Sequence, residues 1–235
     1  MVHIDGDRLL NSLRELRSFG ATGSGVVRPM FSDIDMESRR WLVAQMQDAG
    51  LDAHIDGVGS VHGRSRNPGP ALIIGSHSDT QPEGGWLDGA MGVMYGIEVA
   101  RALNDDPLTR HLAVDVASWA DEEGTYTSCL GSRAFVGDFP DADLENAAAH
   151  GETVEQALAR LGLVDVPALK QLSGALYFPQ HWQPVDWVWQ ILRGLVLVHG
   201  GRDVPEGSQL FESFFTQLGS TGSGLVGDHG GRECV

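Results

Sequence analysis

Two short, mainly apolar runs constrain the fold of this chain more than any other feature of its sequence. They are residues 71–75 (ALIIG) and 112–119 (LAVDVASW), and both match strands that are covered on two faces. The residues between them, 92–103, repeat apolar side chains at helical spacing. The order strand, helix, strand predicts a βαβ unit with two parallel neighbouring strands.

The segments around this unit predict further helices and short strands. Leucines at helical spacing predict a helix over residues 7–18, and a second helix begins after a cap at Asp33 or Asp35. Residues 51–63 alternate and are interrupted by glycines, as two short strands joined by a turn would be. Residues 153–163 predict another helix. We therefore expect an α/β fold, with a mostly parallel sheet sandwiched by helices.

Length, charge and cysteine content narrow the class of protein. The chain has 235 residues, which suits one large domain, and its 42% hydrophobic and 20% charged residues are ordinary for a globular protein. A formal net charge of −16 disfavours nucleic acid and anionic membrane as partners. There is no apolar run of about eighteen residues, and the N-terminus lacks the apolar core of a secretory signal. Two cysteines are too few for a disulfide framework, so we expect a cytoplasmic protein.

The first block with chemical potential, GSHSDT, follows the strand at 71–75 directly. Ligands often lie at the carboxyl ends of strands in open parallel sheets. His77 could bind zinc through a neutral imidazole. Asp79, two residues on, could accept the other ring N–H and so fix the orientation of the imidazole. Alone, a His-x-Asp sequence is more often incidental.

Two acidic blocks complete the pattern. Asp88, in GGWLDG, stands just before the expected helix, where a carboxylate is favoured and could bridge two cations. Asp121, Glu122 and Glu123 repel one another unless positive charge is near, which metal ions supply. One glutamate could bind metal while its neighbour takes a proton from water. A glycine turn or an acidic loop is usually only a solvated element, but together the three blocks predict a metal site.

Longer strings around these blocks resemble a known family. GSHSDTQPEGGWLDGAMGVMYGIEVARAL and DEEGTYTSCLGSRAFVG resemble the hydantoinase/carbamoylase branch of the two-metal aminoacylase and carboxypeptidase-like hydrolases. That branch contains N-carbamoyl-L-amino-acid hydrolases, allantoate amidohydrolases and ureidoglycolate-type enzymes. The upstream segment from Gly20 to Arg64 is similar as well, so the resemblance covers roughly residues 6–165.

The resemblance implies a role for each site residue. His77 would bind one metal ion, Glu123 the second, and Asp88 would bridge both. Glu122 would be the general base and Asp79 would orient His77. Two divalent cations, zinc or else manganese or cobalt, would assist hydrolysis of a linear amide or ureido C–N bond in a small-molecule substrate such as an N-carbamoyl-L-amino acid or allantoate.

The chain also departs from this family. Members carry two later metal-binding histidines, the first in a His-Ile-Glu-Gln-Gly motif, and a dimerisation domain through which they form homodimers. Here the nearest candidate ligand is His181, in YFPQHWQP, and its neighbours do not match. We expect residues 1–171 to be the N-terminal part of the catalytic domain. Residues 172–235 would be a divergent, disordered tail, with the dimerisation domain missing through truncation or a shifted reading frame.

Two other functions fit the same residues. The first is a dipeptidase or aminoacylase, which would use the same site on a different substrate. The second is an inactive metal-binding fragment, which would bind the ions without turnover.

Overall fold

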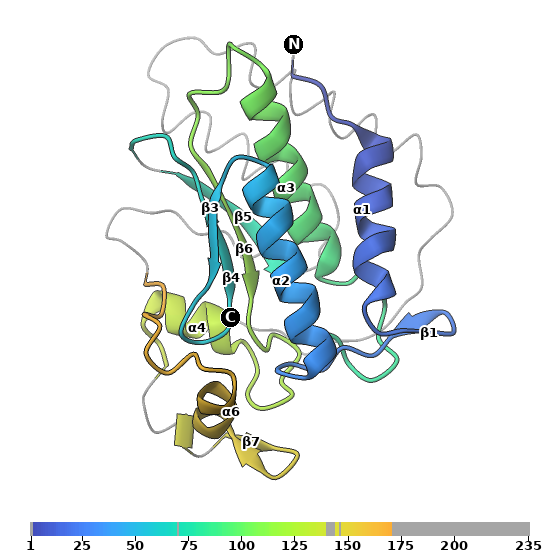
Figure 1. The fold of residues 1–235 in the computed structure, drawn as a ribbon, viewed down its shortest axis with the longest axis vertical. Helices are drawn as coiled ribbons and strands as arrows, with labels where there is room; N and C mark the ends of the chain where they lie inside the picture. The colour runs from blue at the N-terminus through green and yellow to red at the C-terminus, as the bar shows by residue number, and fades with distance from the viewer. Residues whose placement is uncertain (1, 70, 140–143, 146, 171–235) are drawn as a thin grey trace.

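The computed structural model describes residues 2–69, 71–139, 144–145 and 147–170. A four-stranded sheet forms its centre, in the order β3, β4, β6, β5 (Figure 1). These strands are β3 (Asp52–Ile55), β4 (Val61–Arg64), β5 (Leu72–His77) and β6 (Val114–Trp119). The described helices are α1 (Gly6–Ser18), α2 (Asp33–Asp48), α3 (Ala90–Asp105), α4 (Leu130–Val136) and α6 (Val154–Arg160). Two small hairpins are formed by β1 (Ala21–Thr22) with β2 (Gly25–Val26) and by β7 (Ala148–Ala149) with β8 (Glu152–Thr153).

The βαβ unit predicted from the two apolar runs is confirmed. β5 and β6 are parallel neighbours, and α3 connects them in sequence. Gly96 of α3 lies so close to this pair that an added Cβ would be 3.0 Å from Val116 Cγ1 and 3.1 Å from the Ile74 carbonyl oxygen. Because β5 and β6 are parallel and His77 pairs with Trp119, the carboxyl ends of both strands lie at the same edge of the sheet, with α3 packed closely over them.

The expectation of a mostly parallel sheet needs correction. β3 pairs with β4 and β4 pairs with β6 in antiparallel fashion, so the described sheet is mixed. Only residues 56–60 connect β3 to β4, and a connection this short permits a hairpin but no parallel crossover. The α/β class itself is confirmed.

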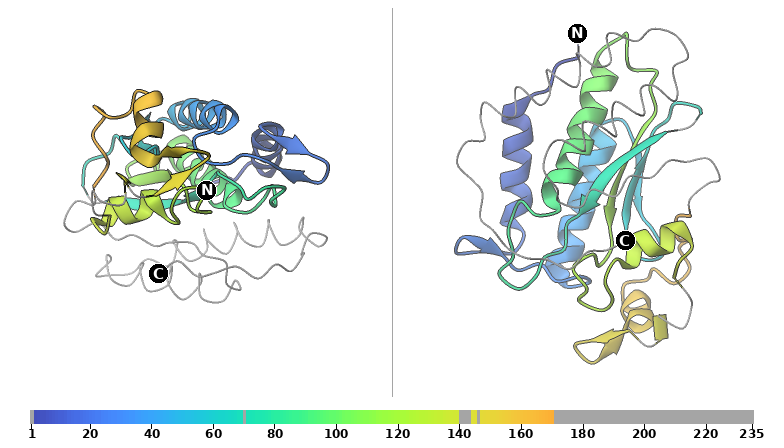
Figure 2. Two further views of the ribbon diagram at one scale, coloured as in Figure 1. Left: turned by 90° about the horizontal axis from the view of Figure 1, so that it is seen from below. Right: turned by 180° about the vertical axis from the view of Figure 1, so that it is seen from behind.

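The helices lie on both faces of the sheet, with most of them on one. α2 and α3 pack on one face, and α1 packs against α3, in a shared core built from residues such as Leu13, Leu42, Val93 and Ile97. α4 lies on the opposite face, where Phe135 packs against Trp119, as the view from below shows (Figure 2). Within the described residues, no helix is both long enough and apolar enough to cross a membrane.

The start of α2 differs from the prediction. Ser32, rather than Asp33 or Asp35, caps this helix, because its hydroxyl oxygen accepts the N–H of Asp35. Asp35 is instead fully buried and pairs with Arg39 one turn along the helix, at 2.8 Å. The expectations for residues 172–235 and for His181 lie outside the described residues.

Candidate metal centre

His77 is the last residue of β5 and is 5% exposed. Its Nδ1 lies 3.0 Å from the main-chain oxygen of Asp79. A carbonyl oxygen can only accept, so this hydrogen bond requires the proton on Nδ1. In the neutral ring, Nε2 then keeps its lone pair, which is the form that a metal ion binds.

Asp88 reaches the site because the next residue is a glycine. Gly89 has φ +61°, and an added Cβ would lie 2.5 Å from both Nε2 and Cδ2 of His77. Only a residue without a side chain lets the backbone pass this close to the imidazole. The loop between β5 and α3, which carries Asp88, is also held by the β1–β2 hairpin, since Val26 donates its N–H to the Gly84 oxygen at 3.0 Å.

The loop after β6 is organised by Asp121, which is fully buried with φ +49°. Its carboxylate accepts three consecutive N–H groups, from Thr125 at 2.7 Å, Tyr126 at 2.9 Å and Thr127 at 2.7 Å. Burial raises the pKa of Asp121 to about 7, against the effect of these donors. The acidic triplet therefore divides into a buried loop organiser, Asp121, and two glutamates that face the site. The sequence pattern did not reveal this separate role of Asp121, although a Gly-Thr pair three residues after an aspartate is a turn signal.

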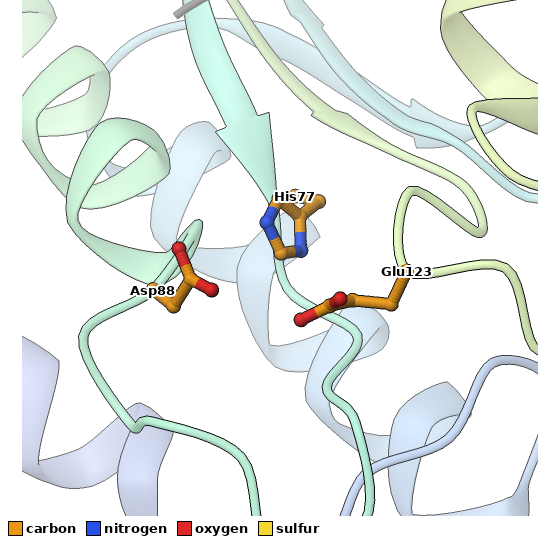
Figure 3. Close-up of side chains that lie close together, drawn as sticks. All are labelled: His77, Asp88 and Glu123. Carbon is orange, nitrogen blue, oxygen red and sulfur yellow. The ribbon is translucent and has the colours of Figure 1, made fainter. Parts of the chain in front are cut away.

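The structure brings together three of the four side chains predicted as ligands, and the fourth, His181, lies outside the described residues. His77, Asp88 and Glu123 each offer one ligand atom, and these atoms all lie within 4.8 Å of one another. The side chains converge from the end of β5, the loop just before α3 and the loop after β6 (Figure 3). One imidazole nitrogen and two carboxylate oxygens are a donor set that suits zinc, manganese or cobalt, so the residues present fit a divalent cation.

Glu122 lies beside this group. Its Oε2 is 3.3 Å from Nε2 of His77. Burial by itself lowers the pKa of His77, but four carboxylates (Asp79, Glu122, Asp88 and Glu123) outweigh it and hold the pKa above its ordinary value. The site therefore concentrates negative charge that a bound cation would neutralise.

Asp79 holds His77 in a different way from the one expected. Its carboxylate Oδ1 is 3.7 Å from Nδ1, beyond hydrogen-bond distance, and its main-chain oxygen makes the contact instead. The carboxylate is fully buried and serves the second loop, since Oδ2 accepts the N–H of Glu123 at 3.1 Å. Asp79 thus connects the segment that carries His77 to the segment that carries Glu123.

Buried arginines beneath the site were not anticipated from the sequence. Arg39 is fully buried, pairs with Asp35 and lies 3.8 Å from Asp79 Oδ1. Arg28 donates to the main-chain oxygens of Ser78, Leu16 and Phe19, which ties the loop after β5 to α1. The four-residue spacing of Asp35 and Arg39 was the one available signal, since it places both on one face of a helix.

Known proteins match part of the chain. Residues 56–150 match the model of Peptidase family M28. An N-carbamoyl-L-amino acid amidohydrolase of Geobacillus stearothermophilus is 33% identical over 166 residues, which are 68% of this chain and 41% of that protein. An allantoate deiminase of Arabidopsis thaliana is 32% identical over 159 residues, 65% of this chain and 30% of that protein.

A solved structure is also similar to this chain over part of its length. The crystal structure of an amidase of the hydantoinase/carbamoylase family from Burkholderia phymatum is 60% identical, with a TM-score of 0.73. The match covers 74% of this chain and 44% of that one, so this chain spans less than half the length of these relatives. Over the part that matches, the chain is similar to members of the hydantoinase/carbamoylase family.

Proposed function

We propose that this chain is the metal-binding part of an amidohydrolase that cleaves a non-peptide C–N bond of a small N-carbamoyl or ureido acid. One observation carries the proposal: ligand atoms of His77, Asp88 and Glu123 converge within 4.8 Å, and Glu122 stands 3.3 Å from the imidazole. The names of the matched relatives, which act on N-carbamoyl-L-amino acids and allantoate, supply the substrate class.

Each residue receives one role in this proposal. His77, Glu123 and Asp88 would hold the two cations, with Asp88 as the ligand shared by both, and His181 is the candidate for a further ligand. Asp79 positions both His77 and Glu123, through its main-chain oxygen and its carboxylate respectively. Two divalent cations, zinc or else manganese or cobalt, would polarise the substrate carbonyl and make water more acidic. The cytoplasmic location and the missing dimerisation domain expected from the sequence stay predictions.

Glu122 is the general base. Its carboxylate takes a proton from the attacking water, the oxygen adds to the ureido carbonyl carbon, and the C–N bond to the terminal nitrogen breaks. Glu122 then returns the proton to the leaving nitrogen, which departs as ammonia. The N-carboxy product of an N-carbamoyl amino acid loses carbon dioxide and leaves the free amino acid.

Peptide-bond hydrolysis is the second candidate function. The match of residues 56–150 to Peptidase family M28 favours it. The metal-binding residues would be the same, and only the substrate would differ, so a dipeptidase or aminoacylase needs no change in the geometry described above.

A substrate comparison separates these functions. The metal-loaded chain is assayed for ammonia release from N-carbamoyl-L-amino acids and allantoate, and for cleavage of dipeptides and N-acyl amino acids. We expect ammonia release that is lost in Glu122→Gln. Cleavage of dipeptides alone would support the second candidate, and metal binding without turnover would support an inactive fragment.

A further inference from the structure

The two loops that carry the site are joined by a second contact besides Asp79. Gln81 belongs to the loop after β5, four residues beyond His77. Its Nε2 donates to the main-chain oxygen of Glu123 at 2.9 Å and to the Glu123 carboxylate Oε2 at 3.0 Å. We propose that Gln81 is a positioning residue that fixes the Glu123 carboxylate for metal binding, an inference that rests on the proposed metal centre.

The contacts of Gln81 restrict Glu123 more than a single hydrogen bond would. One amide nitrogen holds both the backbone and the side-chain end of the same residue, which closes a ring through the glutamate side chain. Closing that ring limits the rotamers that Glu123 can occupy, and a free glutamate side chain would lose considerable entropy on being held.

Together with Asp79, Gln81 holds Glu123 at three points. Asp79 accepts its N–H, and Gln81 donates to its main-chain oxygen and to its carboxylate. Both partners stand within four residues of His77, so the separation between the His77 imidazole and the Glu123 carboxylate is set by one short stretch of chain. Because the Gln81 amide donates to Oε2, we expect Oε1 to be the oxygen of Glu123 that binds a cation.

The restraint on Glu123 matters because neighbouring carboxylates repel its side chain. Glu123 lies near two other carboxylates, Asp88 and Glu122, which act on it electrostatically. In the metal-free protein that repulsion favours rotation of Glu123 away from these two carboxylates, against the attraction of the His77 imidazole. A neutral amide donor opposes the rotation without adding a positive charge that would compete with the cation for the same carboxylate.

A matched pair of substitutions separates positioning from general stabilisation. Gln81→Met keeps the length of the side chain and removes the donor. Gln47→Met is the control, because Gln47 is also exposed and its Nε2 also donates to a main-chain oxygen, that of Ala53 at 3.1 Å, away from the site. Both variants of the full chain are compared with wild type for Co²⁺ affinity, for the visible absorption spectrum of bound Co²⁺ and for thermal stability.

We expect Gln81→Met to bind Co²⁺ about tenfold to a hundredfold more weakly and with a changed spectrum, as loss of a partner that orients a metal ligand generally does. Gln47→Met should keep the wild-type affinity and spectrum, while both variants lose similar, small amounts of thermal stability. Wild-type Co²⁺ binding in Gln81→Met would overturn the role of Gln81 and leave the metal centre standing. A wild-type chain that binds no Co²⁺ would overturn the proposed metal centre itself, and with it this inference.

Discussion

Two buried histidines lie on the central sheet in contrasting surroundings. His62, in the middle of β4, is 2% exposed, and His77, at the end of β5, is 5% exposed. Within the described part of the chain neither ring nitrogen of His62 has a hydrogen-bond partner, and Asp115 Oδ2 lies 3.7 Å from its Nε2. His77 has a fixed main-chain acceptor on Nδ1 and a carboxylate 3.3 Å from Nε2.

The pKa values of the two histidines move in opposite directions. Burial lowers the pKa of His62 to about 4, with His54 and Arg64 adding repulsion. Burial acts on His77 in the same sense, but the surrounding carboxylates raise its pKa overall. Burial is therefore common to both, and the arrangement of charge at the strand end is what distinguishes a candidate ligand from a core histidine.

The largest expected effect is on turnover, when the carboxylate beside each histidine is replaced by the corresponding amide. Glu122→Gln removes the proposed base, so turnover should fall by about a hundredfold to ten-thousandfold. Asp115→Asn makes the equivalent change beside His62 and should leave turnover within about twofold, since Asp115 contacts no proposed site residue in the described structure. Steady-state ammonia release measures both. Equal losses in the two variants would mean that Glu122 has no special role.

Gly89 provides a second test, on the shape of the site. In Gly89→Ala the new methyl group would meet the His77 ring at 2.5 Å, so Asp88 and His77 must separate and metal affinity should fall by about a hundredfold or more. Gly162→Ala is the matched control, because Gly162 also has a left-handed φ, +71°, but open space around an added Cβ. Calorimetric titration with Zn²⁺ compares them. Similar affinities for the two variants would contradict the packing argument.

The pH dependence of stability sharpens the contrast at His62. An ordinary histidine pKa is 6.5, and that of His62 in the folded chain is about 4. Between these pH values the unfolded chain binds a proton that folded His62 does not, so the free energy of unfolding falls as pH falls. The loss in the free energy of unfolding that is due to His62 reaches about 3 kcal/mol near pH 4, and there is no such loss above pH 6.5. His62→Gln should therefore remove that part of the slope in urea unfolding, and an unchanged slope would show that His62 does not titrate in this way.

The smallest effect concerns a hydrogen bond that braces the Glu122–Glu123 loop from outside. Tyr126 donates its hydroxyl hydrogen to Glu152 Oε1 at 2.8 Å and packs against Phe31. Tyr126→Phe keeps the ring contact and loses the hydrogen bond, at a cost of about 1 kcal/mol. Urea unfolding should detect this loss, while Zn²⁺ affinity should change by less than about threefold. A large loss of Zn²⁺ affinity would mean that the brace is part of the site.

The sequence predicted the elements that carry the site better than the contacts within it. Apolar runs and helical spacing placed β5, α3 and β6, because those patterns reflect burial directly. They also indicated that His77 and the acidic triplet share an edge. The antiparallel pairing of β4 with β6 was missed, since strand order depends on long-range packing that local pattern does not record.

The finer roles depended on backbone geometry. That Asp79 holds His77 through its main-chain oxygen, and that Asp121 gathers three N–H groups, follows from torsion angles rather than from residue type. Gly89 carried a weak signal, as a glycine after an acidic residue, but the ring that excludes its Cβ becomes visible only in three dimensions.

The central claim is that His77, with Asp88 and Glu123, binds a divalent cation, and the comparison of the two histidines tests it most directly. Zn²⁺ affinity and stoichiometry are measured by calorimetric titration for wild type, His77→Gln and His62→Gln, after circular dichroism confirms that each is folded. We predict that His62→Gln binds Zn²⁺ like wild type and that His77→Gln binds at least about a hundredfold more weakly. Undiminished binding in His77→Gln would contradict the account.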